Sequence, residues 1–75
     1  MNKVRREMLK NACEKLEAVT EIIELVRDEE SDAFDNMPEG LQESDRGITM
    51  QENIETLEDI ISNLEDISSE LEGII

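Results

Sequence analysis

The side chains of this 75-residue chain that could take part in chemistry are carboxylates and a single thiol. Glutamates occur in pairs three residues apart within segments of helical periodicity, which places both carboxylates of a pair on one helix face. Such pairs can hold magnesium for hydrolysis when they converge on the interior of a helical bundle. Here they lie opposite the apolar stripe, so we expect them on outward, solvated faces. The pairs are Glu14/Glu17, Glu21/Glu24, Glu52/Glu55 and Glu55/Glu58.

The remaining reactive groups give little support for catalysis. The chain has no histidine and no tyrosine, which removes the commonest general base and the Ser-His and Cys-His arrangements. Cys13 has basic residues nearby, but we expect a half-buried small apolar residue and not a reactive thiol. Residues 28–39 imitate a calcium-binding loop, although Ala33 replaces the required glycine and Pro38 intrudes. The ligand-like residues of that loop are Asp28, Glu30, Asp32, Asn36 and Glu39. We therefore predict no enzyme, no metal site and no cofactor.

The net charge of −14 is distributed unevenly along the chain. Residues 28–75 carry sixteen acidic residues against Arg46 alone, whereas residues 1–27 carry six basic residues against five glutamates. This charge works against direct binding to a nucleic-acid backbone and suits a basic partner surface. No apolar run approaches the length of a membrane span, and no segment looks like a signal peptide. With one cysteine as well, we expect a cytosolic protein without a membrane partner.

The C-terminal part of the chain carries a seven-residue apolar repeat. Leu57, Leu64 and Leu71 recur every seven residues, which on a helix makes a stripe that must be buried against another helix. Three residues after each leucine comes an isoleucine, and two further isoleucines widen the stripe. These isoleucines are Ile60, Ile67, Ile74, Ile61 and Ile75. A stripe of this width predicts contact with more than one neighbouring helix.

The whole pattern predicts an all-α fold with a single domain, an antiparallel helical hairpin. We expect helix 1 over about residues 3–30, a connection over 31–47 with a helical turn at Pro38–Glu43, and helix 2 over about 49–72 behind a capping box at Thr49. The expected antiparallel pairs, whose numbers add to 76 or 77, are Val26 with Met50, Ile23 with Ile54, Val19 with Leu57, Leu16 with Ile61 and Ala12 with Leu64.

The same register has two consequences for the surface of the hairpin. It brings the basic N-terminus beside the acidic C-terminus, where ion pairs favour this orientation. It also leaves five apolar residues on the flank, and two hairpins docked through them would make a four-helix bundle. The residues of this predicted oligomer interface are Met8, Ile22, Ile60, Ile67 and Ile74. The expected charged neighbours are Arg5, Arg6 and Lys10 with Glu65, Asp66, Glu70 and Glu72.

Residues 32–61 contain an aromatic residue, then Asp-Asn-x-Pro-Glu-x-Leu-Gln and Gly-x-x-Met ahead of the acidic heptads. The matching positions are Phe34, Asp35, Asn36, Pro38, Glu39, Leu41, Gln42, Gly47 and Met50. In this pattern the chain resembles small acidic helical-hairpin proteins of phages and mobile elements. The resemblance implies a phage-type origin, the cytoplasm of a bacterial host as location, and a functional surface at the hairpin connection. Short phage proteins that look like this often antagonise host defence.

The function that these observations predict is a non-enzymatic protein that binds and inhibits a host factor. The helix 2 carboxylates form a row with ~10 Å spacing that could occupy a basic nucleic-acid-binding groove of that factor. The expected partner-binding residues are Asp35, Asn36, Glu39, Gln42, Arg46, Glu58, Asp59, Glu65 and Asp66. One alternative is a sponge that sequesters a phosphorylated nucleotide between protomers, held by Arg46 or by Lys3, Arg5 and Arg6. Another is an architectural or regulatory bundle without a ligand.

Overall fold

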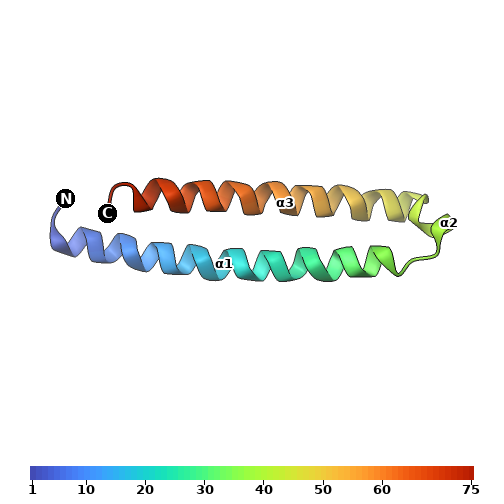
Figure 1. Cartoon of the computed structure of the whole chain (residues 1–75), viewed down its shortest axis with the longest axis horizontal. Helices are drawn as coiled ribbons and strands as arrows, with labels where there is room; N and C mark the ends of the chain where they lie inside the picture. The colour runs from blue at the N-terminus through green and yellow to red at the C-terminus, as the bar shows by residue number, and fades with distance from the viewer.

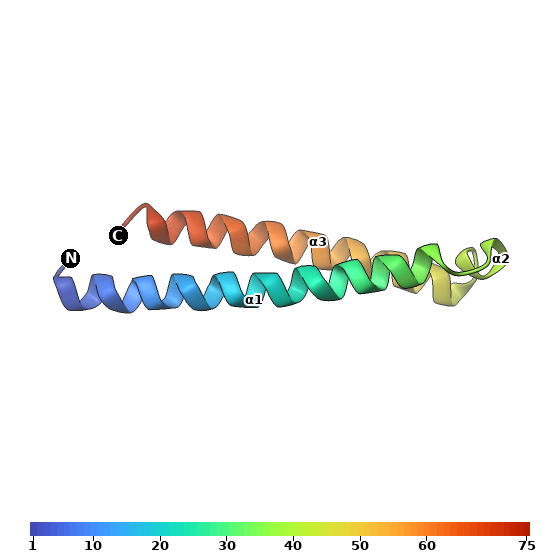
Figure 2. The same ribbon diagram turned by 60° about the horizontal axis from the view of Figure 1, so that its bottom comes forward.

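The computed structural model describes all residues, 1–75, and is entirely helical. Helix α1 spans Lys3–Asp35, α2 spans Glu39–Gln42 and α3 spans Asp45–Glu72. The two long helices run antiparallel, with both termini at one end and α2 at the other (Figure 1). They form a rod of 58 × 15 × 12 Å, and a turned view shows them crossing near α2 (Figure 2). The structure therefore confirms an all-α helical hairpin with a short helical turn in the connection.

Both long helices begin at a polar capping residue, but their bounds differ from the expected ones. The Asn2 side chain accepts a hydrogen bond from the backbone N–H of Arg5 at 2.8 Å. At the start of α3 the cap is Ser44, whose hydroxyl accepts from the N–H of Gly47 at 3.3 Å. This cap starts α3 four residues before the expected Thr49, and α1 continues five residues beyond its expected end. Because a capping side chain satisfies N–H groups that have no partner at a helix start, α3 begins at the Ser44 cap and not at the capping box predicted at Thr49.

The contact between α1 and α3, here called the seam, follows steps of three and four residues on both helices. The half-buried and buried seam residues are Leu9, Cys13, Leu16, Thr20, Ile23, Arg27, Glu30 and Phe34 on α1, Gly47, Met50, Ile54, Leu57, Ile61, Leu64, Ser68 and Leu71 on α3, and Ile75 beyond the end of α3. The expected α1 stripe was wrong in part, since Val19 and Val26 are 44% and 46% exposed. Thr20 takes the buried position instead, and its hydroxyl donates to the Leu16 carbonyl at 2.8 Å. A hydroxyl satisfied within its own helix can enter a seam without a partner across it.

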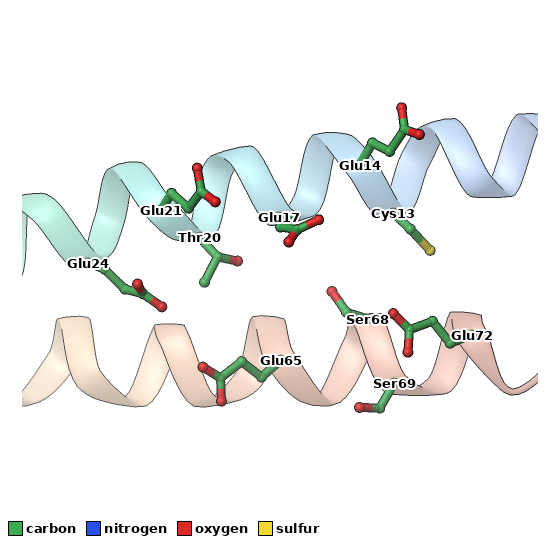
Figure 3. Close-up of a pocket in the computed structure, with 10 residues that line it drawn as sticks. All are labelled: Cys13, Glu14, Glu17, Thr20, Glu21, Glu24, Glu65, Ser68, Ser69 and Glu72. Carbon is green, nitrogen blue, oxygen red and sulfur yellow. The ribbon is translucent and has the colours of Figure 1, made fainter.

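The register of the hairpin also differs from the expected one. Glu17 lies across from Glu65, and Cys13 lies across from Ser69, around one hollow between the helices (Figure 3). The residue numbers of both pairs add to 82, so the helices are shifted by five or six residues, close to one heptad, from the expected register. A repeat of seven matches itself after a shift of seven, so the apolar pattern alone does not select between such registers.

The predicted ion pairs between the basic N-terminus and the acidic C-terminus do not form. The one ion pair of the chain joins Arg27 to its neighbour Asp28 at 3.1 Å. Lys10 and Glu72 border a shallow hollow together but lie too far apart to pair. Opposite charges at this end of the rod are therefore near each other and still free to meet other groups.

The connection is a closely packed corner. The side-chain amide of Gln42 donates to the carbonyl of Phe34 at 2.9 Å, and the same carbonyl at the end of α1 accepts from the backbone N–H of Met37 at 3.0 Å. The Ser44 hydroxyl donates to the Leu41 carbonyl, and Gly47 is buried against the backbone of residues 41 and 42. Gly40 and Gly47 both lie within helices, and no glycine has a positive φ.

Candidate protein-binding surface

The two flanks of the seam differ in chemistry. At about 100° per residue, a residue one position after a seam leucine lies about 100° to one side of that leucine, and a residue three positions after it lies about 60° to the other side. On α3 the first kind is Glu58, Glu65 and Glu72, and the second is Ile60 and Ile67, with Ile74 at the same spacing two residues beyond the helix. On α1 the same offsets from Leu16 give Glu17 and Val19. The hairpin therefore has an acidic side and an apolar side, separated by the seam.

The acidic side contains an open hollow of about 480 Å³ between α1 and α3 (Figure 3). Glutamates and small polar side chains line it, namely Cys13, Glu14, Glu17, Thr20, Glu21, Glu24, Glu65, Ser68, Ser69 and Glu72. It exists because the seam residues here, Thr20 and Ser68, are too short to fill the space between the helices. Figure 3 shows Glu24 reaching toward α3, Glu17 and Glu72 along the edges of their helices that border the hollow, and Glu14 and Glu21 pointing away from α3.

This hollow corrects one expectation from the sequence. The α1 carboxylate pairs were predicted on outward faces, opposite the apolar stripe. In the structure all four of their glutamates border the open hollow, but Glu14, Glu17 and Glu21 are exposed, so only the half-buried Glu24 departs from the expectation. The reason is the shifted phase of the α1 seam, which turns Glu24 toward α3. No three Cys, Asp or Glu side chains lie close enough together to hold a metal ion, so the hollow offers a field of negative charge and no ligand cage.

The apolar side joins both long helices. The predicted oligomer residues all lie exposed, with fractions from 37% for Ile60 to 67% for Met8. Val19 and Val26 extend this surface, and the sequence interpretation had assigned them to the seam. We define the apolar side as Met8, Val19, Ile22, Val26, Ile60, Ile67 and Ile74. An exposed aliphatic surface that continues across two helices is typical of an interaction site.

The predicted partner-binding residues on α3 lie on two neighbouring faces of that helix. Glu58, Asp59, Glu65 and Asp66 are all exposed and each pair repeats after seven residues, but only Glu58 and Glu65 lie on the acidic side, because Asp59 and Asp66 are one residue further round the helix and lie opposite the seam. Glu65 is the member that faces across to Glu17. The sequence interpretation did not include the α1 glutamates in this surface, because their place beside the row depends on the register of the hairpin.

The predicted partner-binding residues of the connection lie at the α2 end of the rod, apart from the middle of the row. Asp35, Asn36, Glu39 and Arg46 are exposed there. Gln42 is half-buried, and its amide is engaged with the Phe34 carbonyl. Since Asp45 and Glu65 are twenty residues apart on one helix, about 30 Å separates the connection from the centre of the row. The structure thus gives two acidic surfaces and does not bring them together.

Two further candidates from the sequence have a purely helical setting. Residues 28–35 of the calcium-loop imitation belong to α1, so they do not form a loop that could wrap an ion. Cys13 is a half-buried free thiol in the seam.

None of the three helices combines the length and the apolar character needed to cross a membrane. Comparison of the chain with protein families, with curated proteins and with solved structures gives no match.

Proposed function

We propose that this protein is a non-enzymatic interaction protein that works as a self-associated hairpin. Two copies dock through their apolar sides into a four-helix bundle, and the acidic sides bind a basic surface of another protein. The observation that carries this proposal is the segregation of apolar and acidic residues on opposite sides of one seam. A surface divided in this way lets a single chain bind itself and a charged partner at the same time.

The small buried core supports self-association. Only three of 75 residues are buried, Thr20, Gly47 and Ile61. A chain of this size needs more burial, a crosslink, a metal or a second copy to be stable. The seven residues of the apolar side expose on the order of 700 Å² per copy, so a symmetric dimer would bury roughly 1,400 Å², within the standard range for stable interfaces.

The acidic side supports a basic partner. Carboxylates from α1 and α3 face the same hollow, and the α3 row repeats every seven residues, or ~10 Å. A nucleic-acid-binding groove presents Lys and Arg side chains for a line of phosphates, and a line of carboxylates can occupy it. In a phage-type protein the partner would be a host defence factor, which is inhibited when its groove is blocked.

Sedimentation equilibrium tests the self-association. We expect the wild-type chain to be a dimer at micromolar concentration and the Ile60→Ser/Ile67→Ser variant to be largely monomeric. Leu41→Ser is the matched control, because Leu41 is a large apolar residue that is 53% exposed but lies in α2. A wild-type chain that remains a folded monomer at high concentration would refute this part of the proposal.

Affinity capture from a bacterial lysate, followed by purification of the captured protein, tests the partner. We expect a basic protein whose binding weakens steeply with salt and is lost in Glu58→Lys/Glu65→Lys. The control Asp32→Lys/Glu70→Lys makes the same change in net charge away from the acidic side. Equal loss of binding in both variants would show that only overall charge matters, and the acidic side would then have no specific role.

A further inference from the structure

We infer that the partner on the apolar side is a second copy packed in the opposite direction, with the two connections at opposite ends of the bundle. This inference rests on the self-association proposed above and specifies its geometry. Three observations bear on it: the spacing of the apolar residues, the charges along the rod, and the charges at the ends of α1.

The apolar side is self-complementary about one height of the rod. On α1, Met8 and Ile22 lie seven residues to either side of Lys15. Ile60 on α3 and Ile74, two residues beyond the end of that helix, lie seven residues to either side of Ile67. The numbers 15 and 67 add to 82, the value found for residues that face each other in the hairpin. A two-fold axis at this height therefore places these four residues in apolar pairs, although Val19 falls opposite Asn11, and the contacts are reciprocal, as in an isologous interface.

In the opposed arrangement α1 stacks on α1 of the partner, and α3 stacks on its α3. The axis then brings Met8 of one copy to Ile22 of the other, Ile60 to Ile74, and Ile67 to itself. Lys15 meets its symmetry mate at the edge of the bundle, where the ammonium group can reach water while its stem packs. The arrangement with both connections at one end would also bring apolar residues of one copy against apolar residues of the other. The apolar pattern alone therefore does not determine the relative direction of the two copies.

The charges along the rod make the choice. Residues 28–46 carry eight acidic side chains against one basic side chain, whereas residues 1–15 carry five basic against two acidic. Packing in the same direction would set two copies of the acidic segment side by side at the connection end. Opposed packing moves these segments to opposite ends of the bundle, several Debye lengths apart. It also brings the basic N-terminal segment of each copy near Asp28 and Glu29 of the other.

The ends of α1 point to the same direction. The first turn of α1 has no acidic residue and its last turn has no basic residue, so the charges at both ends oppose those that the helix dipole favours. Within the hairpin these charges form no ion pair across the seam, since the one ion pair is Arg27 with Asp28. Stacking α1 on α1 of an opposed copy sets the positive start of one helix against the acidic part of the other.

Pulsed electron-electron spin resonance on the full chain distinguishes the arrangements. Each variant carries Cys13→Ser and one labelled cysteine, either Glu29→Cys or Ala18→Cys, both at exposed positions of α1. Glu29 lies fourteen residues from the axis height, so opposed packing predicts about 40 Å between its two labels, at ~1.5 Å per residue. Packing in the same direction predicts less than about 20 Å there. Ala18 is the control, because it lies near the axis and predicts less than about 20 Å for either direction.

Each outcome has one meaning. A short distance at Ala18 with a distance of about 40 Å at Glu29 supports the opposed dimer. Short distances at both positions overturn the inferred direction and leave self-association in place. A helical chain that shows no dipolar coupling at Ala18 and sediments as a monomer overturns the proposed self-association, and the inference with it.

Discussion

Gly47 is the residue of the hairpin corner at which an added side chain would be tolerated least. It lies in the first turn of α3, against the backbone of the last two residues of α2. The Cβ of an alanine at this position would overlap the Gln42 carbonyl and lie 2.6 Å from the Leu41 carbonyl oxygen, whereas relaxed carbon–oxygen contacts are about 3.3 Å or longer. Because the obstructing atoms are backbone, no rotamer change relieves the overlap. We therefore expect Gly47→Ala to push α2 away from α3.

The size of the effect follows from three contributions. Alanine favours a helix over glycine by about 1 kcal/mol, which stabilises the variant. Overpacking at a closely packed site costs about 1–3 kcal/mol, and displacement of residue 42 weakens its hydrogen bond to Phe34, worth about 1 kcal/mol. The net expectation is a destabilisation of about 1–3 kcal/mol, or a fall in Tm of several degrees for a chain of this size.

Urea unfolding followed by circular dichroism measures this change, with all variants at one protein concentration because association shifts the apparent stability. Gly40→Ala is the matched control. Nothing lies within 4 Å of a Cβ added at Gly40, so there the gain in helix propensity should appear alone, about 0.5–1 kcal/mol of stabilisation. If Gly47→Ala were as stable as Gly40→Ala, the corner would not be packed as described.

Three further predictions follow from the seam, the corner and the net charge. Thr20→Val should stabilise the hairpin by about 0.5–1 kcal/mol in thermal melts, because the hydroxyl of this buried residue bonds only within its own helix. The control Thr56→Val removes the same kind of bond on an exposed face and should change stability by less than about 0.5 kcal/mol. Gln42→Ala should destabilise by about 1 kcal/mol through loss of its hydrogen bond to the Phe34 carbonyl, while Gln51→Ala on the exposed face of α3 should be neutral in urea titrations. Raising the salt concentration from about 0.05 M to about 0.5 M should tighten self-association of a chain with a charge of −14 and should weaken capture of the basic partner. Sedimentation and parallel pull-downs measure the two affinities, and a change of both affinities in the same direction would contradict the prediction.

The sequence was sufficient to predict the structure where a strong repeat governs it. The seven-residue spacing of Leu57, Leu64 and Leu71 is clear, and all three lie in the seam. The helical turn after Pro38 also follows from local chemistry, since proline suits the start of a helix and cannot continue the previous one. These elements depend on interactions within a few residues, which a single sequence displays directly.

The α1 seam could not be predicted in full, because polar residues occupy positions that hydrophobicity assigns to valine. Thr20 enters the seam by bonding its own helix, and Arg27 is only half-buried and pairs with Asp28. Val19 and Val26 then remain exposed on the flank of the seam. Hydropathy periodicity has no means of separating an apolar residue that packs within the hairpin from one that stays exposed beside the seam.

The composition of the acidic side depended on the register, which the sequence did not determine. With the expected register Glu65 faces residue 11 or 12, and in the structure it faces Glu17. Two registers that differ by about one heptad bury similar apolar residues, so the corner decides between them. That corner depends on the Ser44 cap and the close approach at Gly47, and these are tertiary features that a local pattern does not reveal.

The small number of buried residues also has a consequence for the life of this protein in a cell. A lone hairpin with three buried residues opens readily, and opened chains are removed by proteases. When folding is coupled to pairing, the folded fraction rises with the number of copies. A burst of synthesis would then produce long-lived rods, whereas slow synthesis would yield chains that are degraded before they meet. Dosage, and not only sequence, would set how long each molecule persists.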